Sequence, residues 1–493
     1  MRHQTPEGLT GTTSPFDNHR KSGHRRLLGL SHSNVNSESD GNSMKARRKL
    51  GIVIIVFLVL GVVGYIAATR TLDHLVRDGT FLRLISRKTA VKLDTDFCGY
   101  LPLAWRGMLI RSDGVLSRGQ PPHSLVEMSA TNLRAHCSLK NLWQRKWTIT
   151  LLEASHLEAA FGPAAAGQLT RILPRQPELE PAIDSKSPLN LDIQETDIAR
   201  TDIYWGEKPE SVGGLKEVHS RFFPKDHGLK VVGGGGTFHQ SGWPDLGVDE
   251  VQIDWAKPKL VVKSAFLSLD QPRNISVMGQ FEFGQQGSMK LHLSSKQAPA
   301  EPLVRGFWRG KFEGVIDSEN DLEKQFGPDA KVNANGQLNF SRASVHDVQA
   351  LKQVALVTRH PQFEKPKIDI LRFGYRLNGD RLEISNFEAE IRGLCRFEGE
   401  FSIDHGNMDG KFKVGAAPDV VEAIPGAREK VFTESRGDYL WTELRLTGPA
   451  SHPREDLSKR LVAAAQEHFS KGLLAPIFKP GKETINLLQQ IYK

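Results

Sequence analysis

Residues 367–391 read K-I-D-I-L-R-F-G-Y-R-L-N-G-D-R-L-E-I-S-N-F-E-A-E-I, the clearest structural signal in the chain. Ile368 and Ile370 set one alternation of apolar and polar residues, and the run that starts at Leu371 sets the opposite one. Because side chains in a strand alternate between two faces, this reversal predicts a β-bulge near Ile370. Asn378-Gly379 predicts a two-residue hairpin turn before the return strand.

The same alternation extends over residues 189–452, where short apolar runs recur about every 8–12 residues with Gly, Asn or Asp between them. Asp404-His405-Gly406-Asn407 predicts a further turn. In the meander over residues 367–414, one face is apolar along its whole length, and the other carries Lys, Arg, Asp and Glu. A helix is predicted over residues 344–358, with Ser344 and Asp347 as its capping pair. We therefore predict a mainly β fold built on a long antiparallel sheet.

Residues 50–68 contain no charged side chain, and only Tyr65 carries a polar group. At about 1.5 Å per residue such a helix is roughly 28 Å long, which is close to the hydrocarbon thickness of a bilayer. We predict a single transmembrane helix over residues 50–69. Four basic residues, at positions 45 and 47–49, precede it, whereas the basic residues that follow it are accompanied by acidic ones. The positive-inside rule then places the N-terminus in the cytoplasm and the bulk of the chain across the membrane.

The remaining boundaries follow from shifts in composition. Residues 1–49 are predicted to form a disordered basic cytoplasmic tail. Residues 70–165 are predicted to form an α/β segment, with a helix over residues 80–88 and a hairpin that turns at Ser112-Asp113-Gly114. Residues 166–188 are predicted to be a proline-rich linker or loop, residues 189–452 the β domain and residues 453–493 a helical C-terminal extension.

Charge and motifs offer little support for catalysis or for nucleic-acid binding. The formal net charge is +8, of which +5 lies in the first 49 residues, so the body of the chain is nearly neutral. Metalloprotease, nucleophile-elbow, phosphate-loop and C-x-x-C motifs are all absent from the sequence. The four glycines at 233–236 and the acids Asp249, Glu250 and Asp254 are best interpreted as parts of strands. We expect no catalytic residue, no metal and no cofactor.

The three cysteines Cys98, Cys137 and Cys395 are too few and too scattered for a disulfide framework. Cys98 and Cys137 could pair in an oxidising compartment. The interpretation that we favour is three small, partly buried apolar side chains.

A long sheet with one apolar face must cover that face. It can pack against a second sheet as a closed sandwich, or it can curl into a groove whose lining accepts an apolar ligand. The predicted membrane anchor favours the groove, because lipid lies beside it. The residues predicted to line the groove are Ile368, Ile370, Phe373, Tyr375, Ile384, Phe387, Ile391, Phe397, Phe401, Phe412 and Leu444.

An N-terminal apolar segment precedes strands around Gly107-Met108-Leu109-Ile110, which are followed by Leu142-Trp143 and Trp147-Thr148-Ile149. Gly336-Gln337-Leu338-Asn339-Phe340 precedes the meander, and the last predicted strand runs into Gly448-Pro449-Ala450-Ser451-His452-Pro453. In these features the chain resembles the AsmA family of bacterial envelope proteins. The long basic tail and the helical extension after His452 depart from the family pattern.

The resemblance implies a curved β groove of the kind called a β-taco, related to bridge-like lipid-transfer proteins. It implies an inner-membrane anchor, a periplasmic body and a part in moving phospholipid for outer-membrane biogenesis or integrity. It supplies no catalytic residues. The helical extension suggests an envelope protein partner at the C-terminal end. The alternative is a non-enzymatic structural or assembly-modulating envelope protein with a closed β core.

Overall fold

The structure is a computed structural model, which describes residues 79–471 except 122, 139, 141–145, 183–189, 226, 284–286 and 328–329, together with 59–64, 66–67, 70–71 and 74. The chain divides into two units, Met1–Ala68 and Thr69–Lys493. The predicted tail and most of the predicted transmembrane helix, residues 50–58 and 65 included, lie outside the described residues. In the part of the chain that is described, none of the helices has the length and apolar character needed to cross a membrane.

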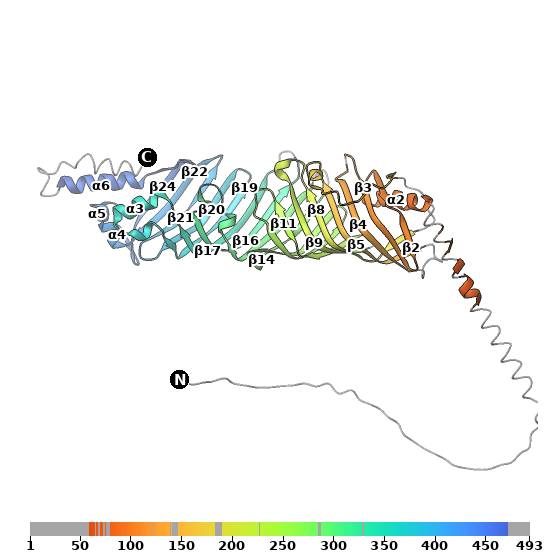
Figure 1. The fold of residues 1–493 in the computed structure, drawn as a ribbon. Helices are drawn as coiled ribbons and strands as arrows, with labels where there is room; N and C mark the ends of the chain where they lie inside the picture. Colours follow the sequence, from red (N-terminus) through yellow and green to blue (C-terminus); the bar gives the residue numbers. More distant parts are fainter. Residues whose placement is uncertain are drawn as a thin grey trace, which may run out of the picture. The chain divides into compact units, whose positions relative to one another are not determined.

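The second unit is mainly β, as predicted, and the 25 strands among its described residues form a single mixed sheet (Figure 1). The strands are β1 (Phe97–Tyr100), β2 (Leu103–Arg106), β3 (Leu109–Arg118), β4 (Leu125–Ser138), β5 (Lys146–Phe161), β6 (Glu180–Pro181), β7 (Asn190–Ile193), β8 (Thr196–Trp205), β9 (Gly213–Lys225), β10 (Gly228–Gly234), β11 (Thr237–Gln240), β12 (Leu246–Ala256), β13 (Lys259–Leu269), β14 (Gln271–Glu282), β15 (Ser288–Pro299), β16 (Phe312–Gln325), β17 (Val332–Val345), β18 (Lys367–Ile368), β19 (Ile370–Asn378), β20 (Arg381–Ile391), β21 (Cys395–Asp404), β22 (Asn407–Ala416), β23 (Glu434–Arg436), β24 (Tyr439–Pro449) and β25 (Arg454–Glu455). The helices are α2 (Gly79–Leu93), α3 (Gln349–Thr358), α4 (Pro418–Glu422), α5 (Ala427–Lys430) and α6 (Leu457–Lys471).

Strands that follow one another in the chain pair antiparallel along most of the sheet, from β8 through β9 to β22 and β24. The exception is β5, which pairs parallel with both β7 and β8. Because this pairing is parallel, β7 begins beside the start of β5, so the chain returns along the length of β5 between the two strands. The prediction of a purely antiparallel sheet is wrong at this joint, which lies beside the predicted proline-rich linker. That linker region contains β6, which pairs with β1.

The hairpin turns show where local sequence was sufficient. β21 and β22 meet at Asp404↔Asn407, which confirms the turn predicted there. The break between β18 and β19 falls at Asp369, one residue from the predicted bulge. β19 ends at Asn378 and β20 begins at Arg381, so the turn residues are Gly379-Asp380, shifted by one position from the prediction.

Two local predictions are wrong. The first hairpin turns between Arg106 and Leu109, and Ser112-Asp113-Gly114 lies inside β3. The helix predicted from residue 344 begins at Gln349, because Ser344 is still paired within the sheet. Val348 is the N-cap residue, and no side-chain hydrogen bond caps this end of α3.

Helices lie against the sheet at both of its ends. At the first end, Ala90 of α2 is fully buried with Val115 and Ala130. At the last end, α4, α5 and α6 form a core with β21, β22 and β24, and the most deeply buried side chains there include Val421 and Ala464. We call the three helices α4, α5 and α6 the C-terminal cap. Of the predicted helical extension, residues 472–493 lie outside the described residues.

Candidate apolar binding face

Strand registers assign each side chain of the meander to one of two faces. Phe373 lies opposite Leu338, and Phe401 lies opposite both Ile384 and Gly410. Residues directly opposite each other in a sheet project to the same side. These pairings place Phe340, Phe373, Phe387, Phe401 and Phe412 on one face, which we call the apolar face. The other face, which carries Arg372, Glu388, Arg396 and Glu398, we call the charged face.

Phenylalanine rings form a continuous ladder on the apolar face, across β16, β17, β19, β20, β21 and β22. Successive ring centroids are 5.4 Å apart from Phe312 to Phe340, and 6.1 Å apart both from Phe340 to Phe373 and from Phe373 to Phe387. Phe387 then lies 6.5 Å from Phe401 and 5.8 Å from Phe412. Spacings of 4.5–7 Å are those of interacting aromatic pairs. The ladder is a single apolar stripe that crosses six strands.

Glycines on the same face make room for these rings. A Cβ atom at Gly399 would lie 2.8 Å from Cδ1 of Phe412, and one at Gly410 would lie 2.8 Å from Cβ of Phe401. At Gly336 the same test gives 2.9 Å to Cε1 of Tyr375. A side chain at any of these glycines would therefore collide with an aromatic residue of the face, and the aromatic contacts compensate the weak strand propensity of glycine. This role of the glycines carries no separate signal in the sequence, where they occur within ordinary strand alternation.

The structure distributes the eleven predicted lining residues over three environments. Phe373, Phe387, Phe401 and Phe412 belong to the ladder, and Tyr375 and Ile384 lie opposite each other beside it. A second group packs into closed cores instead of along the open part of the face: Ile391, Phe397 and Leu444 against the C-terminal cap, and Ile368 against the core around Phe312.

Ile370 does not belong with the others. It lies opposite Glu390, next to the pair Arg372 and Glu388, which places it on the charged face. The prediction for Ile370 is wrong because the strand breaks at Asp369, before Ile370 and not after it. Ile370 therefore follows the alternation of Leu371 and projects to the face opposite that of Leu371.

The apolar face continues beyond the predicted meander. Val231 lies opposite Ile253, Ile253 opposite Val262, and Val277 opposite Leu293, and all of these side chains are half-buried. The sequence signal for them is the same two-residue alternation, which the lining prediction applied only to the residues from 368 onward. Half-buried apolar side chains thus recur on this face from β10 to β22, interrupted by Ser295, Ser318 and Asn320.

The charged face is neutralised by cross-strand ion pairs. Arg372 Nε donates to Glu388 Oε2 at 2.6 Å, and Arg396 bonds both Glu388 and Glu390. Glu398 pairs with Arg436 at 2.6 Å. Each of these carboxylates accepts from an arginine, so the acids of this face act as sheet-stabilising partners and do not form an acid–base couple.

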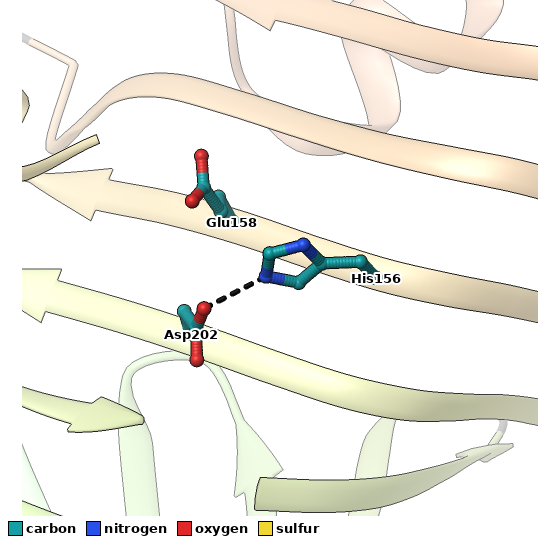
Figure 2. A group of neighbouring side chains, drawn as sticks. All are labelled: His156, Glu158 and Asp202. Carbon is teal, nitrogen blue, oxygen red and sulfur yellow. Dashed lines mark hydrogen bonds and ion pairs between the residues drawn. The ribbon is translucent and has the colours of Figure 1, made fainter. Parts of the chain in front are cut away.

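His156, Glu158 and Asp202 form a cluster of side chains whose donor types bind divalent metals (Figure 2). One donor atom from each residue lies within 4.8 Å of the others. His156 Nε2 is 2.7 Å from Asp202 Oδ2, to which Arg200 Nε also donates at 3.2 Å. Glu158 is fully buried, and its Oε1 accepts from the backbone N–H and the hydroxyl of Thr170.

Asp202 is already saturated by protein donors. Its Oδ1 accepts the backbone N–H of Glu217 at 2.6 Å, and Glu217 has the left-handed φ of 61° that marks a bulge. Burial raises the pKa of Asp202, but the hydrogen bonds from Glu217, His156 and Arg200 outweigh it, so the pKa lies below its ordinary value. The positive charge of Arg200 opposes a second cation at the same oxygen.

The same device recurs at Asp317, which belongs to no such cluster among the described residues. Asp317 Oδ1 accepts the backbone N–H of Gln297 at 2.7 Å, and Gln297 also has a left-handed φ, of 51°. Both aspartates thus satisfy the free N–H of a bulge in a neighbouring strand. We interpret Asp202 as a structural clamp of this kind, with His156 orienting it, and we assign no metal to the cluster.

The other sequence candidates are likewise structural. Asp249 accepts the backbone N–H of Arg273 at 2.8 Å, and Asp254 pairs with Lys225 at 2.9 Å. Gly236 has a φ of 76°, and a Cβ there would lie 2.1 Å from the carbonyl oxygen of Lys216, so its role is close backbone approach.

The three cysteines are free and buried. Burial raises the pKa of Cys98 and of Cys395 to about 12, and that of Cys137 to about 11. Thiols of this kind behave as small apolar side chains.

Fold and site together define a mainly β protein that presents one extended apolar face and one ion-paired face. Comparison with protein families, with characterised proteins and with solved structures finds no match to this chain.

Proposed function

We propose that this protein is a non-enzymatic lipid-binding or lipid-transfer protein whose acyl-chain site is the apolar face. The observation that carries the proposal is the phenylalanine ladder. Phe373, Phe387 and Phe401 are only half-buried although they stand in the middle of a sheet, and their rings follow one another at about 6 Å. Alkyl chains are the ligands that match a ladder of phenylalanine rings, because the rings offer no hydrogen-bonding group. The polar side chains beside the ladder bond to one another: the Tyr375 hydroxyl donates to Asn320, and the Asn320 amide donates to Ser318.

Binding would be driven by removal of apolar surface from water. Each CH₂ group that the face covers contributes about 0.8 kcal/mol. Because neighbouring rings are alike, a chain can shift along the ladder with little change in contact energy. A face of this kind supports passive sliding, with the lipid head group left in water.

Membrane attachment and location complete the proposal. The apolar segment at residues 50–68 would anchor the chain as a single-pass protein of a bacterial inner membrane, with the N-terminus cytoplasmic and the sheet in the periplasm. The ligand would be a phospholipid, and the role would be in outer-membrane biogenesis or integrity. The resemblance to the AsmA family supports this assignment, and we propose membership of that family on the same grounds.

Site-specific photocrosslinking in cells tests the proposal on the full chain. Benzoylphenylalanine replaces Phe401 on the apolar face or, as a matched control, its exposed neighbour Glu400 on the charged face. We expect a covalent phospholipid adduct, identified by mass spectrometry, at position 401 and none at position 400. Crosslinks from position 401 to protein alone would refute lipid binding and support the closed, structural β core.

A further inference from the structure

The apolar face ends against a helix at the last long strand of the sheet. Phe412, where the ladder stops, lies opposite Leu444 of β24. Leu444 packs against the core of the C-terminal cap, together with Leu457 and Leu461 of α6. The lining of the face therefore runs directly into the contact surface of α6.

α6 is held there by Ala464, Leu457 and Leu461, which pack in or against the apolar core, and by a few polar contacts. Ala464 is 3% exposed, and its carbonyl oxygen would lie 2.6 Å from a Cβ at Gly426. This distance shows how closely α6 approaches the turn between α4 and α5. Arg460 donates to the Thr442 hydroxyl at 3.0 Å and to the carbonyl oxygen of Glu443, both on β24. Lys430 of α5 pairs with Glu467 at 3.2 Å.

The opposite end of the same face is covered as well. The ring of Phe81 in α2 lies 5.5 Å from Trp147, and Trp147 is 5.6 Å from Trp105. Trp105 lies opposite Ile110, Ile110 opposite Ala135, and Ala135 opposite Leu152, which continues the apolar face through β2 to β5. A ligand on the face thus meets a helix at each end.

We propose that α6 is a displaceable plug that closes the C-terminal end of the apolar face, an inference that rests on the proposed lipid function. With α6 docked, lipid is retained; with α6 released, Leu444 extends the ladder to the edge of the sheet. α6 is suited to this role because exposed ion pairs such as Lys430–Glu467, whose side chains are 51% and 39% exposed, hold a helix only weakly. The polar contacts of Arg460 make it the residue whose loss releases the helix.

Two readouts on the full chain test the plug. The first is labelling of Leu444→Cys by a small maleimide, which reports release of α6 and is assigned to position 444 by mass spectrometry. The second is transfer of a fluorescent phospholipid between donor and acceptor vesicles. Arg460→Ala should raise both about tenfold, the population change that follows from a loss of about 1.4 kcal/mol. Lys459→Ala, at an exposed position of the same helix that makes no hydrogen bond or ion pair among the described residues, should change neither.

The converse variant locks the helix. Lys430→Cys with Glu467→Cys, joined by a short bis-maleimide, should suppress labelling at position 444 and reduce transfer below the wild-type rate. If the wild type transfers lipid and neither Arg460→Ala nor the locked variant alters the rate, the plug is refuted while the lipid function stands. If labelling responds as expected but no variant transfers or binds lipid, the lipid function fails and α6 is a structural cap only.

Discussion

Phe387 is the ring on which the ladder depends most, and its truncation gives the most direct test of the apolar face. Its centroid lies 6.1 Å from Phe373, 6.5 Å from Phe401 and 5.8 Å from Phe412. Each such pair contributes about 0.5–1.5 kcal/mol beyond the area it buries, and truncating a fully buried Phe costs about 3–5 kcal/mol. Because Phe387 is half-buried, we expect Phe387→Ala to lower the free energy of unfolding by about 2 kcal/mol.

Urea unfolding of the full chain, followed by circular dichroism, measures this loss. Met278→Ala is the matched control, because Met278 is 46% exposed and lies opposite His292 on the charged face. Its truncation should change the free energy of unfolding by less than about 0.5 kcal/mol. Phe387→Leu should recover part of the loss, since it restores buried area but not the ring contacts.

The functional half of the prediction uses the crosslinker at position 401. Phe387→Ala should reduce the phospholipid adduct there, because it interrupts the stripe next to that position. The reasoning is refuted if Phe387→Ala unfolds no more easily than Met278→Ala, since the rings would then not act as one packed unit.

Three further outcomes follow from the structure. Gly399→Val should lower the melting temperature by several degrees and reduce lipid crosslinking, because its side chain would enter the space of the Phe412 ring, a clash of about 1–3 kcal/mol. Asp202→Asn should cost about 2 kcal/mol in chemical unfolding, because the clamp on Glu217 loses its charge. A carboxyl group whose pKa is lowered on folding stabilises the fold above its ordinary pKa, so wild-type stability should fall below about pH 4, and less so in Asp202→Asn. The thiols should resist Ellman's reagent at pH 8 in the native state, because burial shields them and raises their pKa values. All three should react in guanidinium, which unfolds the chain. Rapid labelling of the native protein would contradict the burial.

Turns and strands that local chemistry specifies were predictable. The reversal after Ile370 locates the break at Asp369 within one residue, and Asp404-His405-Gly406-Asn407 forms the turn between β21 and β22. Both signals are short-range, because they depend on side-chain alternation and on residues that tolerate positive φ.

Predictions failed where a distant segment overrides a local preference. Ser112-Asp113-Gly114 has the composition of a turn, yet Ser112 Oγ donates to the carbonyl oxygen of Leu101 at 2.9 Å. Gly114 is approached by the side chain of Leu173, which would lie 2.1 Å from a Cβ there. Ser344 fails as a helix cap for a similar reason, since it pairs with Lys367. None of these partners is adjacent in sequence.

The sequence by itself determined that this chain forms a mainly β protein with one apolar face, because a two-residue period leaves side chains no other arrangement. It also supplied the rings that meet in the ladder. Only the tertiary structure decided that β5 pairs parallel with β8, that glycines lie beneath the rings, and that α2 and α6 cover the two ends of the face. These features depend on register and on contacts between remote elements, which a pattern of alternation does not encode.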